Sequence, residues 1–362
     1  MHVVIDKQEL EYAVSVVSKA LASKQDGKMG LITLNTESDK LVLTTGNGEI
    51  VLSYTLPTSE VIEQGTVNVS GRVFCEAVKK MPKGDLELKV ENNELFLIYL
   101  DGCFAVTIMP EDSNWLTYRL PSKAKEITLD TKVFKQIIRQ SIPFCSTDAS
   151  RPLLKGVNIK ASGKTMYVAA LDGYRISKTE VEVESEVDEL NVVVPASSLN
   201  CVSSFLSDEG TVTLKVSNAE NLLLVKHGDI TFTSLLLAGE YVDYNRIIPT
   251  TFNTYVAVKK DDFLQAVERA LILYDTAFSV DFNVLETKVE VSAKGVIGET
   301  KTNVEAKVQG KDVDIRFNGK YILSALKVIN NEMIFIGFNK ENEPAVIKDG
   351  KSMYLFLPIR KM

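Results

Sequence analysis

The sequence is poor in the residues that enzymes most often use for chemistry. It contains only two histidines, His2 near its start and His227 just before a glycine that we expect in a hairpin turn. It has no Gly-x-Ser-x-Gly, no Walker loop and no His-x-x-x-His. Asp172-Gly173 resembles part of a metal or phosphatase site, but no second carboxylate is placed to complete one, so we expect a turn there. The sequence therefore predicts no enzyme, no catalytic residue, no metal and no cofactor.

Cysteines and long apolar runs are also scarce. Cys75, Cys103, Cys145 and Cys201 are far apart and have no CxxC or metal-ligand spacing, which is typical of reduced thiols in a cytosolic protein. The first residues carry acidic side chains where a signal peptide would be apolar, and no apolar run approaches the roughly 18 residues of a membrane span. We therefore expect a cytoplasmic protein with no membrane partner.

Basic residues are outnumbered by acidic ones. The 41 lysines and arginines against 48 aspartates and glutamates give a formal net charge of −7 and a pI of about 5.2. This balance alone argues against a protein that grips nucleic acid through an extended basic surface. It does not say where on the molecule the positive charges lie.

What the sequence does contain is an internal repeat. Three segments, beginning at Val3, Ile127 and Val256, each consist of a short apolar strand, a charged opening and an amphipathic helix. In the first segment Leu10, Val14, Val17 and Leu21 have the spacing of one helical face, and the other two segments repeat this pattern. The same strand–helix unit therefore occurs about every 125 residues.

A second set of three segments lies between the first. These segments begin at Val67, Val192 and Ile315, and each joins a β-branched strand to a helix through a capping stretch. Alternating strands follow each helix, and Asn92-Asn93 is expected to form a two-residue hairpin turn. The chain is therefore predicted to be α+β, with three similar domains that each contain two β-α-β-β-β half-repeats. The predicted domains are residues 1–121, 122–249 and 250–362, with prolines near the two boundaries.

Several of the six predicted helices carry a net positive charge. The segment from Gly71 to Lys83 has four basic residues and one acid, and that from Asn318 to Asn330 has two lysines and no acid. If the half-repeats stack into a curved sheet that closes, the helices would line its hole. A mildly basic lining on an acidic body suits non-specific contact with DNA that still permits sliding. A charge run can equally be a solvated face, and an α+β array without special purpose is the alternative.

Five short segments carry a resemblance to a known family. They are Arg151–Val157, Ala170–Ile176, Gly239–Pro249, Phe317–Leu323 and Leu357–Arg360, in the family's order and spacing. Through them the chain resembles the beta subunit of bacterial DNA polymerase III, the DNA sliding clamps, over essentially its whole length. The resemblance implies a processivity factor whose homodimeric ring, helices inside and sheets outside, encircles duplex DNA. It would be nucleoid-associated and would bind the polymerase alpha subunit, the clamp loader and other proteins that carry a clamp-binding motif.

The resemblance also implies a hydrophobic peptide-binding cleft between the second and third domains. Apolar anchors of a partner peptide would enter this slot, and arginines at its edge would hold backbone or carboxylate groups. The residues that match the family's cleft are Leu154, Leu171, Gly173, Tyr174, Arg175, Ile176, Val242, Arg246, Ile247, Tyr321, Pro344, Ala345, Leu355, Leu357, Pro358, Ile359 and Arg360. Some of them, such as Leu355 and Leu357, could equally be plain core residues.

Two further sets of residues follow from the same resemblance. The family's dimer is head-to-tail, and the matching interface residues are Phe104 and Val106 on one side and Leu271, Ile272 and Leu273 on the other. The candidates for contact with DNA phosphates are Lys24, Arg72, Lys79, Lys80, Arg151 and Asn318.

The chain departs from the family pattern at several of these positions. Thr45-Gly46-Asn47 replaces a Thr-Asp pair in the first domain, Leu171 and Tyr174 replace a threonine and a histidine, and Val242 replaces a proline. These departures leave open a clamp paralogue that acts as a peptide-binding or drug-decoy protein without an essential role in replication. A monomeric peptide-binding scaffold is a third possibility.

Overall fold

The computed structural model of the chain describes residues 1–21, 30–110, 124–273 and 276–361. Its internal contacts group these residues into two compact units, each built on one antiparallel sheet. Among the described residues, no helix combines the length and the apolar character needed to cross a membrane.

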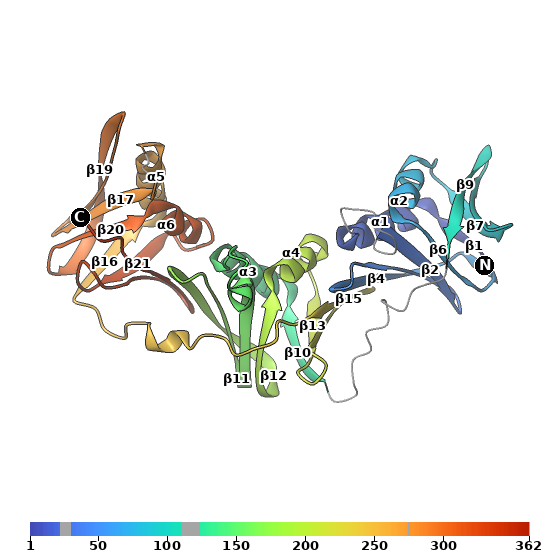
Figure 1. Cartoon of the computed structure of the whole chain (residues 1–362), viewed down its shortest axis with the longest axis horizontal. Helices are drawn as coiled ribbons and strands as arrows, with labels where there is room; N and C mark the ends of the chain where they lie inside the picture. The colour runs from blue at the N-terminus through green and yellow to red at the C-terminus, as the bar shows by residue number, and fades with distance from the viewer. Residues whose placement is uncertain (22–29, 111–123, 274–275, 362) are drawn as a thin grey trace. The chain divides into compact units, whose positions relative to one another are not determined.

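The first unit comprises residues 1–135 and 197–236. Its 13-stranded sheet has the order β10-β13-β14-β15-β4-β3-β2-β6-β9-β8-β7-β1-β5. Helices α1 and α2 pack against each other beside this sheet (Figure 1). The elements are β1 His2–Asp6, α1 Lys7–Val17, η1 Ser18–Ala20, β2 Leu31–Glu37, β3 Lys40–Gly46, β4 Ile50–Pro57, β5 Glu60–Glu63, β6 Thr66–Ser70, α2 Gly71–Lys80, β7 Asp85–Glu91, β8 Glu94–Tyr99, β9 Gly102–Met109, β10 Lys125–Asp130, β13 Thr211–Ser217, β14 Leu222–His227 and β15 Ile230–Leu235.

The second unit comprises residues 136–196 and 237–362. Its 10-stranded sheet has the order β11-β12-β23-β22-β21-β16-β19-β18-β17-β20. Helices α5 and α6 pack against each other (Figure 1). The elements are η4 Ile142–Phe144, η5 Pro152–Lys155, β11 Gly156–Leu171, β12 Arg175–Pro195, η6 Tyr244–Arg246, β16 Thr254–Lys259, α5 Lys260–Ala270, η7 Leu271–Leu273, β17 Ser279–Leu285, β18 Lys288–Gly295, β19 Gly298–Gly310, β20 Val313–Asn318, α6 Gly319–Leu326, β21 Met333–Phe338, β22 Ala345–Asp349 and β23 Ser352–Phe356.

The predicted helical faces are confirmed except at Leu21, which lies beyond the end of α1 and is half-buried. In α1, Leu10, Val14 and Val17 are fully buried, and the side chain of Asp6 caps the helix by accepting from the backbone N–H groups of Gln8 and Glu9. In α3 Thr131–Ser141 and in α5 the predicted apolar positions are likewise buried. A helix keeps one face toward the sheet, so apolar spacing alone identified the buried side.

The half-repeat architecture is also confirmed. Three similar segments each contain two strand–helix–strand units, and six α-helices occur in the part of the chain that the structure describes. The central segment differs in one respect, because β12 continues without a break into the strand that precedes α4 Ala196–Phe205. The buried Val183, Val187 and Leu190 lie along this continuous stretch, where the pairing with β11 shifts register.

The turn predicted at Asn92-Asn93 joins β7 to β8. Both residues have positive φ angles, 48° and 65°, and Glu91 pairs with Glu94. Two consecutive left-handed residues are the requirement of a type I′ turn, and asparagine tolerates this conformation better than most residues. The hairpin in domain 1 is therefore encoded locally.

Candidate functional site

The floor of the candidate site comes from three neighbouring strands of the second unit. Ile176 on β12 pairs with Leu355 on β23, and Leu355 pairs with Val346 on β22. The three side chains are buried in one apolar cluster with Leu154 and Leu171. Successive side chains of a strand alternate between the two faces, so this row belongs to a single face of the sheet. The structure thus brings together four predicted cleft residues, namely Leu154, Leu171, Ile176 and Leu355.

The turn between β11 and β12 forms one wall of the site. The Asp172 carboxylate accepts hydrogen bonds from the backbone N–H groups of Tyr174 and Arg175, at 2.9 and 3.1 Å, which confirms the expected turn. Gly173 has a φ of +98°, and a Cβ there would lie 2.8 Å from Nη1 of Arg151. Glycine is therefore favoured at this position by the backbone conformation.

Arg175 is held firmly in this wall. Its Nε donates to Oδ2 of Asp172 at 2.9 Å, and its Nη1 donates to the Ser324 hydroxyl at 2.6 Å. The guanidinium carbon lies 4.3 Å from the ring centroid of Tyr321 and 5.1 Å from that of Phe144. A guanidinium that is paired and stacked in this way orients its neighbours, so Arg175 fixes the Tyr321 side of the site.

A polar pocket of about 300 Å³ opens beside this wall. The exposed Tyr174 ring stacks on the Tyr321 ring at 6.2 Å, and both rings line the pocket with Arg151 and Cys145. Burial raises the pKa of the Cys145 thiol to about 12, so the thiol stays protonated at neutral pH. Arg151, predicted to contact DNA, therefore lies at the rim of the predicted cleft.

The segment after Leu237 supplies the opposite wall. The buried Tyr241 hydroxyl donates to the carbonyl of Gly156 and accepts from the N–H of Leu171, each at 3.3 Å, which anchors the segment to β11. Beyond this anchor Val242 and Ile247 are 46% and 44% exposed. The Arg246 side chain is 86% exposed and pairs with Asp243 at 3.0 Å. This wall therefore presents apolar side chains and the exposed guanidinium of Arg246 to solvent.

The C-terminal segment continues the site beyond β23. The N–H of Leu357 donates to the carbonyl of Tyr174 at 2.9 Å, and the N–H of Ile359 donates to that of Arg316 at 2.8 Å. Leu357 is 37% exposed, and Pro358 and Pro344 are half-buried. Ile359 and Arg360 line a separate polar pocket of about 370 Å³ with Arg316.

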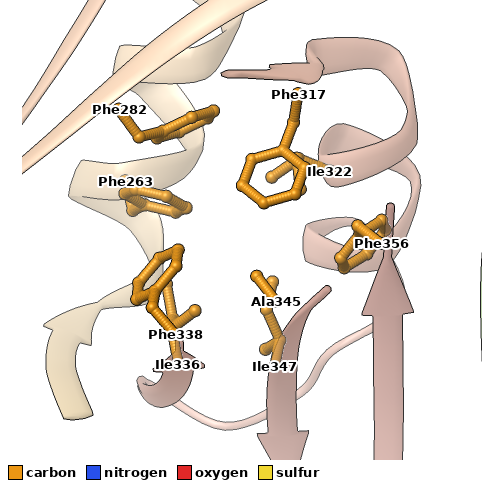
Figure 2. A pocket seen from close by; sticks show the side chains of 9 residues that line it. All are labelled: Phe263, Phe282, Phe317, Ile322, Ile336, Phe338, Ala345, Ile347 and Phe356. Atoms are coloured by element: carbon orange, nitrogen blue, oxygen red, sulfur yellow. The ribbon is translucent and has the colours of Figure 1, made fainter. Parts of the chain in front are cut away.

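Ala345 faces the opposite side of the sheet from Val346. Figure 2 shows Ala345 with Phe263, Phe338 and Phe356 around a small cavity inside the third domain. The cavity has about 10 Å³ of free space and a wholly apolar lining, so water gains no hydrogen bonds there. Sequence reasoning assigned Ala345 to the cleft and missed Val346, although the alternation of β22 was the available signal.

The predicted DNA contacts lie on several elements. Arg72, Lys79 and Lys80 are exposed on α2, and Lys79 pairs with Glu76 at 3.5 Å. The Asn318 side chain caps α6 by accepting from the N–H of Lys320 at 3.0 Å. Lys24 lies outside the described residues. These residues remain predictions for contact with phosphate.

The predicted dimer contacts lie on β9 and η7. On β9, Phe104 is 40% exposed and Val106 is buried. On η7, Ile272 is 71% exposed, while Leu271 packs near Gly319 and Leu273 near Gly298. Within the described residues no cluster of three acidic, histidine or cysteine side chains could hold a metal ion.

Three family models match successive parts of the chain. They describe the N-terminal domain of the DNA polymerase III beta subunit at residues 1–114, its central domain at 128–243 and its C-terminal domain at 245–360.

Individual relatives match over nearly the whole length. The beta sliding clamp of Halalkalibacterium halodurans is 32% identical, with 99% of this chain and all of the relative covered. That of Staphylococcus epidermidis is 30% identical over 91% of both chains. The crystal structure of the DNA polymerase sliding clamp from Bacillus subtilis superposes with a TM-score of 0.94 at 26% identity, covering all of both chains.

Proposed function

The chain belongs to the DNA polymerase III beta subunit family, and we propose that it forms a closed ring of two chains around duplex DNA. Family membership makes it a non-catalytic processivity factor of DNA polymerase, as the scarcity of catalytic motifs predicted. In this proposal three domains per chain, bounded near residues 121 and 249, build a six-domain ring. The ring is supported by the way in which the edge strands of the half-repeats pair.

One junction between half-repeats lies inside the first unit. Strand β4, which ends the first half of domain 1, pairs with β15, which ends the second half of domain 2. Hydrogen bonds from Thr55 to Asp229 and from Leu235 to Glu49 extend the ladder at both ends. Its middle pair, Leu52 and Phe232, is fully buried.

A second junction, inside the second unit, has the same design. Strand β12, which ends the first half of domain 2, pairs with β23, which ends the second half of domain 3. Hydrogen bonds from Leu357 to the carbonyl of Tyr174 and from Glu180 to that of Lys351 again extend the ladder at both ends. The middle pair, Ser177 and Tyr354, is also fully buried.

Two strands that end a half-repeat take part in neither internal junction. These are β9, which ends the second half of domain 1, and β19, which ends the first half of domain 3. Among the described residues, Gly102–Thr107 of β9 and Gly298–Glu305 of β19 each pair with a strand on one side only. An unpaired edge is a template for another strand. In both internal junctions the last strand of a second half-repeat pairs with the last strand of a first half-repeat. The same pairing between chains would join β9 of one chain to β19 of the next, a head-to-tail contact that can close a ring.

The position of Phe104 is the observation that carries this proposal. Phe104 is the third residue of β9 counted from its hairpin tip, the position that Phe232 holds in β15 and Tyr354 in β23. Thr300 is the third residue of β19 counted in the same way. The middle residues of both internal junctions are 0% exposed, whereas Phe104 is 40% exposed. A half-exposed phenylalanine at a position that is otherwise buried fits a seam that closes on a second chain. Ile272, on η7 beside β19, would be covered by the same contact.

We further propose that the site on β12, β22 and β23 binds the clamp-binding peptides of the polymerase and other partners. Its buried apolar floor, the exposed Val242, Ile247 and Leu357, and the exposed Arg246 provide pockets for apolar anchors and a cation at the edge. Exposed basic residues of α2 would meet DNA phosphates non-specifically.

Primer extension tests the proposed function. The cognate polymerase and clamp loader copy a long, singly primed circular template with and without the protein, under conditions that permit only one binding event. We expect products several-fold longer when the protein is present. Products of unchanged length, with a loader shown to work on another clamp, would refute the role in processivity and favour the paralogue.

A further inference from the structure

The face of the sheet that forms the cleft floor continues past the cleft. Val346 on β22 pairs with Gly337 on β21, and Gly337 pairs with Tyr255 on β16. The ring of Phe252 lies directly on Gly337, because a Cβ at this glycine would meet that ring at 2.5 Å. Phe252 packs against the apolar cluster under the cleft, and its ring centroid is 5.8 Å from that of Tyr255. Aromatic side chains thus lead from the cleft floor onto the open sheet.

The neighbouring row on the same face adds a second exposed aromatic residue. Met353 pairs with Lys348, Lys348 with Phe335, and Phe335 with Ala257. Phe335 is 58% exposed and Tyr255 is 49% exposed. Single exposed apolar residues are ordinary on protein surfaces, but here two lie on adjacent strands and join an apolar cluster. We call Phe252, Tyr255, Phe335, Lys348 and Lys307 the outer strip.

The two lysines of the outer strip lie on either side of its aromatic residues. Lys348 neighbours Phe335 on one side, and Lys307, which pairs with Ala257, lies on the other. Both lysines are exposed, and neither has an ion-pair partner among the described residues. On a chain of net charge −7, two unpaired cations beside exposed aromatic rings favour an acidic ligand that carries an aromatic side chain.

We propose that the outer strip is a second contact site for partners held in the cleft. Its occupant is an acidic segment with an aromatic residue, adjacent in the partner's sequence to the cleft-binding peptide; this proposal rests on the proposed peptide-binding function. The aromatic residue packs between Phe335 and Tyr255, and carboxylates meet Lys348 and Lys307.

The geometry makes such a two-site contact accessible to one peptide. Neighbouring strands lie about 5 Å apart, so Tyr255, two strands from Val346, is about 10 Å from the cleft floor. A spacer of about four residues spans this distance when extended. Once the first segment is bound, the second binds from a high effective concentration, so a weak contact raises the affinity measurably.

Titration of labelled peptides tests the proposal. The short peptide carries only leucine and phenylalanine anchors for the cleft. The extended peptides add a Gly-Ser spacer and a segment of glutamates around one tryptophan, at either the N- or the C-terminal end, and the control peptides carry Gly-Ser alone. One of the two acidic extensions is expected to bind the wild-type protein about tenfold more tightly than its control, equivalent to about 1.4 kcal/mol.

Variants assign that gain to the outer strip. Phe335→Ala and Lys348→Glu are expected to abolish the gain and leave the affinity of the short peptide unchanged. Ile62→Ala, at an exposed apolar position on β5, is the matched control and should keep the gain. If the short peptide binds normally but the acidic extensions add no affinity, or if the added affinity survives Phe335→Ala, the outer-strip proposal is refuted and the cleft proposal stands. A short peptide that fails to bind would overturn the cleft and this proposal with it.

Discussion

Two arginines border the candidate cleft, and their surroundings differ. Arg175 is paired with Asp172, bonded to Ser324 and stacked on Tyr321, and its side chain is only 13% exposed. The Arg246 side chain is 86% exposed and forms an ion pair with Asp243. At the residue scale the first is a positioning residue, and the second is free to reach a ligand.

The difference predicts separate effects of two substitutions. Arg175→Ala strands the largely buried Asp172 carboxylate, and we expect it to lower the free energy of unfolding by about 1–3 kcal/mol and to weaken peptide binding. Arg246→Ala should weaken peptide binding while leaving the thermal midpoint unchanged, because exposed ion pairs contribute little. Calorimetry and peptide titration on both variants check this. Equal thermal midpoints for the two variants would contradict the positioning role of Arg175.

Three cysteines, the buried Cys75 and the half-buried Cys145 and Cys201, are expected to resist alkylation in the folded protein. Burial raises the pKa of Cys75 and Cys201 to about 11 and that of Cys145 to about 12. The thiolate is the reactive form, and a raised pKa leaves roughly one thiol in a thousand or fewer ionised at pH 8. Iodoacetamide at pH 8, followed by mass spectrometry, should modify these cysteines only after urea is added. Rapid modification of Cys145 without urea would mean that the pocket beside Tyr174 opens readily.

Part of the predicted cleft set comes together in the structure, and the cleft itself remains a proposal. Leu154, Leu171, Ile176 and Leu355 were identified by resemblance and lie in one cluster. Val346 belongs to the same cluster but was not among the predicted residues, and Arg151, which remains a prediction for contact with DNA, lies against Gly173. Local alternation can assign a residue to one face of a strand, but which residues of distant segments become neighbours depends on strand pairing.

The two faces of strand β23 pack against different parts of the second unit. Leu355 packs in the cluster beneath the cleft, and its neighbour Phe356 lines the cavity inside the domain (Figure 2). Both are about 1% exposed, so burial alone does not distinguish them. Alternation along the strand does.

Substitutions at these two positions should therefore differ. Phe356→Leu enlarges the existing cavity, and we expect it to cost about 1–2 kcal/mol of stability while leaving peptide affinity unchanged. Leu355→Ala should cost about 2–4 kcal/mol and also weaken peptide binding, because it removes part of the cleft floor. Urea unfolding and peptide titration measure the two quantities. A loss of peptide affinity in Phe356→Leu equal to that in Leu355→Ala would contradict this division of the strand.

Elements with a strong local signal were predictable. Helical periodicity identified the buried faces of α1, α3 and α5, and Asn92-Asn93 specified a turn. The short β5 and the unbroken course of β12 were not foreseen. The pairing of β5 depends on β1, which is distant in sequence, and the length of β12 depends on its pairing with the long β11.

At the scale of the whole molecule, the proposed pairing of β9 with β19 of a second chain predicts the effect of a charge placed between the two chains. Phe104→Arg places a cation where the internal junctions bury Phe232 or Tyr354, so the variant should be monomeric. Ile62→Arg, at a comparably exposed site on β5, should remain dimeric. Light scattering at equal concentrations distinguishes one chain mass from two. A dimeric Phe104→Arg with unchanged affinity would place the seam elsewhere.

The sequence could suggest a ring only through family resemblance, because charge and periodicity do not specify which edges meet. The two internal ladders support the proposed closure, in which β9, with its half-exposed Phe104, would complete the pattern.

Retention on circular DNA tests the closed ring most directly. The protein is loaded by a functioning clamp loader onto a nicked circular plasmid, washed in high salt and then followed as the plasmid is linearised. High salt removes phosphate contacts but not a topological link. The account predicts that the protein stays on the circle through the wash and leaves when the DNA is cut, whereas Phe104→Arg is lost at the wash. Loss of the wild-type protein at the wash would contradict the closed ring.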